Sequence, residues 1–451
     1  MQDFTEGNIL KQVIGFSLPL LIANFLQSFS GIINIIWIGR MLGPSSIAAV
    51  TISMPIVFFL ISGIIGLNIA TNVIVAQVYG SKNMKLMEKV FANSLMTNLF
   101  LCLVISIFSI FFSGKLLDMI NAPKEIKPEA QSFFIVVLIG LVFQFTYNWY
   151  SGALRGLGDS KTPLYILIVN TILNFIFVPI FIIGFGPIPK LGIVGAAIAN
   201  ILSSFLSLLA LYFYTIRINP FFNIQKWDFT VDWKIIKKVF TIGIPASLQM
   251  VIVSFAGTVI SYLVNKFGTN IIAAYGIGMQ TDQLAFLPAM SIGIAISSMV
   301  GQNLGIGKYD RVKKIFHYSV TLSLIISFIF FIVIFFFPKQ IASLFTKNTD
   351  VIGYAVGYLK IVSFTYICFA LIFALQGIVR AAGDTLAMLI LTIITVVIFR
   401  LPLAYFLSEH TSLRQNGIWV SILISTVAAV VLNYLYYING RWKRIKIIHS
   451  M

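Results

Sequence analysis

One carboxylate lies deep inside a long apolar stretch of this sequence. Asp282 is the only one of the fourteen acidic residues so placed, about 11 residues from the start of its stretch, or roughly 16 Å along a helix. A charge removed from water needs a partner, so we expect Arg400, which interrupts another apolar stretch at a similar depth, to pair with it. Because uptake of H⁺ or Na⁺ would release that partner, we predict an ion-coupling site at Asp282 and Arg400. The alternative is a fixed ion pair that only joins two helices.

Neutral amides inside the apolar stretches form a second group of candidates. The amides that we expect to line a substrate cavity are Asn34, Asn174, Gln249 and Gln280. The simpler explanation for each is a hydrogen bond between helices, worth on average about 0.6 kcal/mol. The three histidines and two cysteines share no metal-ligand spacing. Na⁺ at Asp282 is therefore the one metal site considered, and no cofactor is expected.

The elements that must position these residues are membrane-spanning helices. The chain has 451 residues, of which 59% are hydrophobic and 10% charged, against about 25% charged residues in a soluble globular protein. A spanning helix needs about 20 apolar residues, and twelve such segments can be read. They cover residues 13–36, 47–76, 91–113, 131–154, 163–184, 192–215, 236–264, 271–300, 315–337, 352–379, 386–408 and 416–439. Because a backbone in lipid must satisfy its own hydrogen bonds, we predict an all-α polytopic membrane protein.

Positive charges are distributed unevenly between the loops. If the N-terminus is placed in the cytoplasm, Lys and Arg are twice as frequent in the inner loops as in the outer ones. Because positive residues favour the inner side, both termini are predicted to be cytoplasmic and the protein to lie in the cytoplasmic membrane. This topology also accounts for the net charge of +17 without a nucleic-acid partner. The first apolar segment is expected to be a span and not a cleaved leader.

The chain repeats itself at an offset of 225 residues. The matching positions include Gly43 and Gly268, Gln77 and Gln302, Arg155 and Arg380, and Asp159 and Asp384. Residues 1–222 and 223–451 each hold six segments, which predicts two six-helix lobes related by a parallel repeat. Secondary transporters commonly have this arrangement, with the substrate site between the lobes. The loop residues also have a structural explanation: Gly80, Gly158, Gly305 and Gly383 are expected to end helices with positive φ, and Asp159 and Asp384 to cap the helices that follow.

Three segments resemble blocks of the multidrug and toxic compound extrusion (MATE) family. They are "LIANFLQSFSGIINIIWIGRMLGPSSIAAV", "SGALRGLGDSKTPLYILIVNTILNFIFVPIFIIG" and "DQLAFLPAMSIGIAISSMVGQNLGIGK". The resemblance spans nearly the whole chain. It implies two six-helix lobes in a V and an alternating-access antiporter that exports organic cations, drugs or amphipathic metabolites in exchange for H⁺ or Na⁺. The expected partners are such a small molecule and the lipid bilayer, with the protein acting as a monomer.

Two positions depart from the pattern of that family. Many members have an aspartate in the first helix, where this sequence has Asn34, and some have one before the proline of the fifth helix, where it has Val178. Asn34 and Asn174 can form a neutral polar cluster that cannot titrate. The resemblance also implies an acid at the position of Asp282. The sequence leaves two alternatives, an antiporter coupled through Asp282 in the C-terminal lobe and a weakly coupled facilitator.

Two other functions fit the sequence less well. A flippase for a lipid-linked or other amphipathic substrate is the alternative within the wider superfamily that the resemblance implies. A carrier of anionic lipids would need several basic residues in its lumen, and only Arg400 and Lys360 are candidates. An intramembrane enzyme would need a nucleophile and base, or a metal constellation, at one depth. Since one buried acid and no pair of buried histidines are available, the sequence predicts a transporter and not an enzyme.

Overall fold

The computed structural model describes residues 1–120, 123–187, 189–218, 220–445 and 447–448. Within these residues, twelve helices are long and apolar enough to cross a membrane, which confirms the predicted all-α polytopic fold. The chain divides into two compact units, and the described residues of unit 1 are Met1–Asp3 and the bulk of Leu18–Ile244. Unit 2 contains Phe4–Ser17 and the described residues after 244. The lobe boundary at residues 222 and 223 stays a prediction.

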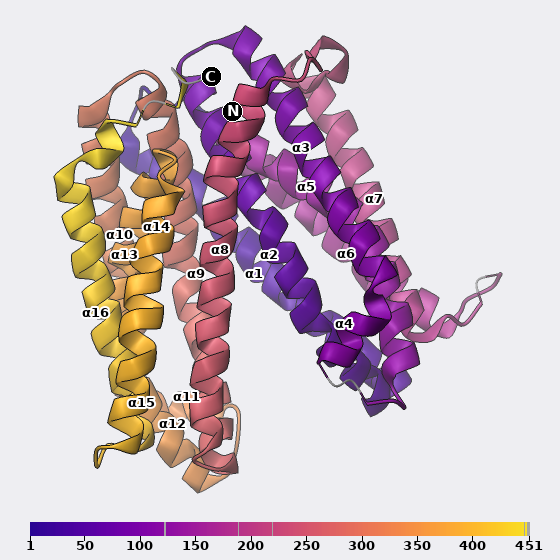
Figure 1. Ribbon diagram of the computed structural model, residues 1–451, viewed down its shortest axis with the longest axis vertical. Helices are drawn as coiled ribbons and strands as arrows, with labels where there is room; N and C mark the ends of the chain where they lie inside the picture. The colour runs from indigo at the N-terminus through magenta and orange to yellow at the C-terminus, as the bar shows by residue number, and fades with distance from the viewer. Residues whose placement is uncertain (121–122, 188, 219, 446, 449–451) are drawn as a thin grey trace. The chain divides into compact units, whose positions relative to one another are not determined.

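Unit 1 is built around two helices, α2 and α5. Its helices are α1 (Ile9–Leu42, from Leu18 on), α2 (Pro44–Gly80), α3 (Met84–Phe111), α4 (Ser113–Met119), α5 (Lys127–Gly156), α6 (Lys161–Ile183), α7 (Gly192–Ile218) and the first part of α8 (Trp233–Asn265). α2 and α3 pack against α5, α5 packs against α7, and α6 packs against α7 (Figure 1). An apolar core that includes Ile64, Phe134 and Phe145 lies among them.

Unit 2 is built around α9 and α13. Its helices are the rest of α8, α9 (Thr269–Gly305), α10 (Tyr309–Phe336), α11 (Pro338–Ser343), α12 (Thr349–Val362), α13 (Phe364–Ala381), α14 (Thr385–Thr392), η3 (Ile393–Arg400), α15 (Leu401–Glu409) and α16 (Gln415–Asn439). α13 contacts α9, α10 and α16 (Figure 1). α9 is the most enclosed of the described spanning helices, so most of its side chains face neighbouring helices.

The tenth predicted segment is divided into two helices at Ser363. Its hydroxyl donates to the carbonyl of Lys360 at 3.1 Å, and the hydroxyl of Thr365 donates to the carbonyl of Val362 at 2.6 Å. Hydroxyls that bond to carbonyls one turn back compete with the helical ladder and bend it. The break separates α12 from α13 and places one tyrosine of the functional site on each helix.

The eleventh predicted segment contains a wide helical turn before its proline. Residues Ile393–Arg400 form a π-helix between α14 and α15. Pro402 has no backbone N–H to donate to the preceding turn, and π-helical turns accommodate such a disturbance within a helix. Arg400 is the last residue of this turn, so the wide turn sets the direction of its side chain.

The repeated loop residues behave differently in the two halves. Asp159 caps α6 by accepting bonds from the backbone N and hydroxyl of Thr162 at 3.0 and 2.7 Å. Asp384, expected to cap α14, makes no capping bond to its described residues. It accepts instead from the Tyr436 hydroxyl and pairs with Nε of Arg441 at 2.9 Å, and these stronger partners explain the difference.

Two of the four glycines expected to have positive φ do so. Gly158 and Gly383 have φ of 82° and 80°. Gly80 and Gly305 instead end α2 and α9 within the helix, and the left-handed residue of each loop is Lys82 or Gly307. The prediction was wrong for Gly80 and Gly305, because the residue with positive φ in each loop comes two positions after the glycine.

The N-terminal segment of unit 2 is fixed by the end of α9 and the start of α10. Gln302 Oε1 accepts from the backbone N of Phe4 at 2.9 Å, and Asn303 Nδ2 donates to the Phe4 carbonyl at 3.0 Å. Arg311 donates to the carbonyls of Phe4, Glu6 and Gly7. Gln302, one of the repeated residues, therefore has a local structural role.

Candidate functional site

Asp282 of unit 2 is held by two tyrosines. The hydroxyl of Tyr358 on α12 donates to Asp282 Oδ2 at 2.5 Å, and the hydroxyl of Tyr366 on α13 donates to Oδ1 at 2.7 Å. The tyrosines are 2% and 1% exposed. Both oxygens of the carboxylate thus have a donor, and three helices meet at one acidic group.

Aromatic packing fixes the first of these phenols. The ring of Trp419 on α16 lies edge-on to Tyr358, with ring centroids 4.7 Å apart, and stacks on Tyr275 of α9 at 5.4 Å. Edge-on and offset pairs of this kind are favourable arrangements of aromatic rings. Tyr275 also lies edge-on to Tyr358, with ring centroids 5.9 Å apart, so two rings restrict the movement of the Tyr358 hydroxyl away from Asp282.

Arg400 bonds to a different helix from the one expected. Its Nε donates to the hydroxyl of Ser425 at 2.7 Å, and its Nη2 donates to the hydroxyl of Thr426 at 3.2 Å, both on α16. Within the described part of the chain, Asp282 and Arg400 form no ion pair. The structure thus differs from the expected direct pair, because phenols occupy both carboxylate oxygens and two hydroxyls hold the guanidinium.

The Asp282 site offers few groups that could hold a cation. The described residues contain no group of three or more His, Cys, Asp or Glu side chains arranged to bind a metal. The oxygen atoms joined by hydrogen bonds at this site are the two of Asp282 and the hydroxyls of Tyr358 and Tyr366. A carboxylate with two phenols can exchange a proton, and its oxygens are also the ligand type that Na⁺ takes.

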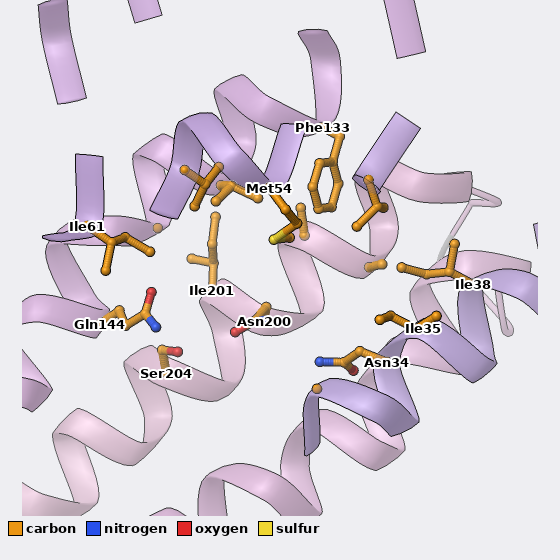
Figure 2. Close-up of a pocket in the computed structure, with 17 residues that line it drawn as sticks. Asn34, Ile35, Ile38, Met54, Ile61, Phe133, Gln144, Asn200, Ile201 and Ser204 are labelled. Atoms are coloured by element: carbon orange, nitrogen blue, oxygen red, sulfur yellow. The ribbon is translucent and has the colours of Figure 1, made fainter. Parts of the chain in front are cut away.

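Unit 1 contains a cavity of about 330 Å³, which we call the unit 1 cavity. Small-molecule sites commonly measure about 300–1,000 Å³. One face each of α1, α2, α5 and α7 forms its wall (Figure 2). The lining residues are Gly31, Asn34, Ile35, Ile38, Val50, Met54, Val57, Ile61, Phe133, Val137, Gly140, Gln144, Ala196, Ala197, Asn200, Ile201 and Ser204. Its apolar wall is continuous with the core of unit 1, which includes Ile38, Val57 and Phe133.

The polar groups of the unit 1 cavity are all neutral. They are Asn34, Gln144, Asn200 and Ser204. Asn34 Oδ1 is buried and has no hydrogen-bond partner among the described residues. Since a buried acceptor without a donor is unfavourable, this atom is available to a ligand that carries an N–H or O–H group.

The amides predicted from the sequence lie in different surroundings. Asn34 lines the unit 1 cavity, whereas Asn174 is buried on α6 outside the lining. Gln249 Nε2 donates to Thr392 Oγ1 at 3.0 Å and so joins α8 to α14. Gln280 has an exposed side chain on α9. Val178, at the position where some members of the resembled family have an acid, is 1% exposed in the apolar core of unit 1.

Sequence reasoning did not single out Tyr358, Tyr366, Gln144, Asn200 or Ser204 as site residues. For the cavity residues, the sequence does contain a pattern that could have identified them. Gly140 precedes Gln144 by four residues, and Ala196 precedes Asn200 by four, so on each helix a small residue shares a face with an amide. A small residue lets a neighbouring helix approach that face, as Ile201 of α7 does at Gly140, so an amide on the same face lies beside another helix. The tyrosines have no comparable signal, because apolar spans contain many aromatic residues.

Comparison with known families and proteins gives consistent matches. The family model MatE matches residues 19–180 and again residues 245–406. That both halves match one model agrees with the internal repeat. A Bacillus subtilis protein described as probable multidrug resistance protein YpnP is 34% identical over 449 residues, covering 99% of this chain and 98% of that protein. Probable multidrug resistance protein NorM of Thermotoga maritima is 25% identical over 436 residues, covering 97% and 94%.

Solved structures match the fold over almost the full length. A crystal structure of a MATE mutant superposes with a TM-score of 0.89 at 23% identity, covering 99% of this chain and 98% of that one. A Vibrio cholerae MATE transporter, VcmN, superposes with a TM-score of 0.88 at 20% identity, covering 96% and 97%. At such identities the likeness concerns the fold.

Proposed function

Because the chain belongs to the MatE family, whose members are membrane transporters and not enzymes, we propose that it is a cation-coupled antiporter. It exports organic cations, drugs or amphipathic metabolites across the cytoplasmic membrane by alternating access, in exchange for H⁺ or Na⁺. Both termini are cytoplasmic in this proposal, as the distribution of Lys and Arg favours. The names of the relatives, which describe multidrug resistance proteins, support an export function.

The observation that carries the coupling proposal is the placement of Asp282. It is the one acid well inside the spans of the sequence, and its two oxygens accept from Tyr358 and Tyr366. Ionisable groups at this depth are costly to keep and commonly mark ion pathways. A proton on the carboxylate would neutralise the acceptor of the two phenols, and Na⁺ would compete with the phenols for its oxygens. Because the phenols are on α12 and α13, cation uptake changes how α9 is bonded to both helices.

Arg400 is the second charged residue of the proposed coupling site in unit 2. Its guanidinium bonds to hydroxyls and not to a carboxylate, so its charge remains uncompensated by a direct partner within the described residues. α16 carries both Trp419, which packs against Tyr358, and the two hydroxyls that hold Arg400. We propose that Arg400 sets how readily Asp282 gives up its cation, without contacting it.

The test is gradient-driven efflux from proteoliposomes that contain the full chain. The probes are ethidium, an organic cation, and chloramphenicol, an uncharged amphipathic drug, each under an imposed H⁺ gradient or an imposed Na⁺ gradient. We expect wild type to export at least one probe under one gradient, and Asp282→Asn to lose this export. Asp310→Asn makes the same chemical change at a side chain that is 94% exposed and should export like wild type.

Two results would contradict the proposal. Equal export by Asp282→Asn and wild type would remove Asp282 from coupling. Failure of wild type to move either probe under either gradient would contradict drug antiport and favour a narrow or lipid-linked substrate. The gradient that drives export identifies H⁺ or Na⁺ as the coupling ion.

A further inference from the structure

The wall of the unit 1 cavity has no charged side chain among its lining residues. We propose that this cavity binds the exported molecule and selects uncharged amphipathic compounds with a hydrogen-bond donor over organic cations. The inference rests on the proposed function, because it names the substrate class of that transporter. The resemblance implied organic cations, drugs or amphipathic metabolites as substrates, and this inference narrows that range to uncharged amphipathic compounds.

The polar and the apolar side chains of the unit 1 cavity lie on different sides of it. Figure 2 shows Gln144, Ser204, Asn200 and Asn34 along one side of the cavity in this view, with Ile61, Met54 and Phe133 on the other. A ligand with an apolar body and a polar edge matches both sides at once. Met54 adds a flexible wall that adapts to the shape of an apolar body.

Asn34 determines which polar group the ligand should carry. Its Oδ1 is buried without a partner among the described residues, so it requires a donor. A phenol, an amide N–H or an alcohol supplies one. A quaternary ammonium has no N–H or O–H at its charged end and cannot satisfy this atom there.

An organic cation would also find no counter-charge in the wall. The acid nearest along a lining helix is Glu129, one turn before Phe133 on α5, and it accepts a hydrogen bond from Ser46 and lies outside the lining. Phe133 is the single aromatic ring of the wall, and one ring gives a limited cation–π attraction. A cation entering the cavity therefore gives up hydration without ionic compensation.

A pair of isosteric probes isolates the effect of charge. 4-tert-Butylphenol and (4-hydroxyphenyl)trimethylammonium have the same shape and the same phenolic donor, and differ in one positive charge. The dissociation constant of each probe for the purified full-length protein is measured by equilibrium dialysis in detergent, with no ion gradient. We expect wild type to bind the uncharged probe at least tenfold more tightly than the cation.

Three variants connect this preference to the unit 1 cavity. Gly31→Leu should abolish binding, because a Cβ atom at residue 31 meets no other atom within 4 Å and the leucine would project into free space in the cavity. Gly353→Leu is the matched control, since residue 353 on α12 also has free space and does not line the cavity. Asn34→Asp introduces a carboxylate of the same shape and should reverse the preference in favour of the cation by at least tenfold.

Several outcomes would overturn the inference. They are equal or tighter binding of the cation by wild type, binding of neither probe, and unchanged binding in both Gly31→Leu and Asn34→Asp. These outcomes are separable from failure of the proposed function, because the binding assay needs no gradient. Selective binding without any gradient-driven export would contradict antiport and leave the cavity assignment intact.

Discussion

The ring of Tyr358 occupies the space in which a side chain at Gly278 would lie. A Cβ atom at residue 278 would be 2.3 Å from Cε1 of Tyr358 and 2.4 Å from its Cδ1. Gly278 and Asp282 are four residues apart and share one face of α9. Tyr358 can therefore lie against the helix at residue 278 and donate to the carboxylate one turn later.

Gly278→Ala should displace Tyr358 from Asp282. The added methyl group forces the ring to move, and overpacking of this kind typically costs about 1–3 kcal/mol of stability. We expect gradient-driven export to fall roughly tenfold or more, since a hydrogen bond to a charged group contributes about 1.5–3 kcal/mol. Initial export rates and the thermal unfolding midpoint measure the two effects. Gly276→Ala, at a site where a Cβ meets nothing within 4 Å, is the control, and equal rates in both variants would refute the prediction.

Tyr358→Phe and Tyr366→Phe should each impair coupling while preserving shape. Each variant removes one donor to Asp282 and leaves its ring in place. Export rates should fall roughly tenfold in either variant. Tyr275→Phe removes a hydroxyl from the same aromatic cluster without removing a bond to Asp282. If Tyr275→Phe causes the same loss, the effect belongs to the cluster and not to the carboxylate.

Removing the hydroxyls that hold Arg400 should destabilise unit 2. The double variant Ser425→Ala and Thr426→Val leaves the guanidinium without its two acceptors. We expect the free energy of unfolding to fall by roughly 3 kcal/mol or more, because two hydrogen bonds to a charged group are lost. The measurement is the thermal unfolding midpoint in detergent, which should be lower. Ser421→Ala is the control on the same helix, because that buried hydroxyl donates to the carbonyl of Ile418 and does not hold Arg400. A midpoint no lower than that of Ser421→Ala would contradict the assignment.

The loop before α8 should loosen in acid. Hydrogen bonds from the hydroxyl and backbone N of Thr230 hold the pKa of Asp228 below its ordinary value of 3.8, with Lys89 assisting. A lowered pKa stabilises the fold above pH 3.8, and this contribution is lost as the pH falls through the folded value. The fluorescence of Trp227, which is 6% exposed, should report this transition. Asp228→Asn should remove this acid transition. Trp227→Phe should remove the fluorescence change and so show that Trp227 is its source. A transition that persists in Asp228→Asn would have another origin than Asp228.

The sequence predicts the fold well because each span carries its own signal. A run of about 20 apolar residues is a local property, and the repeat of Arg155 and Asp159 at Arg380 and Asp384 needs no knowledge of contacts. The same local reasoning fails for the break at Ser363, since hydropathy continues unchanged through it. It also fails for Asp384, whose partners Tyr436 and Arg441 are more than 50 residues away.

The candidate site was only partly predictable, for a related reason. Depth along the helices predicted that Asp282 needs a partner, but depth alone does not give the rotation of a helix about its axis. Arg400 and Tyr358 can lie at comparable depths, and the rotation of each helix decides which one faces the carboxylate. For the unit 1 cavity, Asn34 was identified and Asn200 was not, because the sequence does not say which amides share one space.

The amide side chains of the unit 1 cavity have a consequence for its chemical tolerance. Gln144 and Asn200 each carry a donor and an acceptor at opposite positions of one planar group, and a half-turn of that group exchanges the two. Such a wall can complement many patterns of ligand donors and acceptors without a change in its shape. It cannot create a net charge by any rotation. If the cavity binds the exported molecule as we propose, it is permissive toward functional groups and discriminating toward ionisation, and a single change of ionisation state in a compound decides whether that compound is retained or exported.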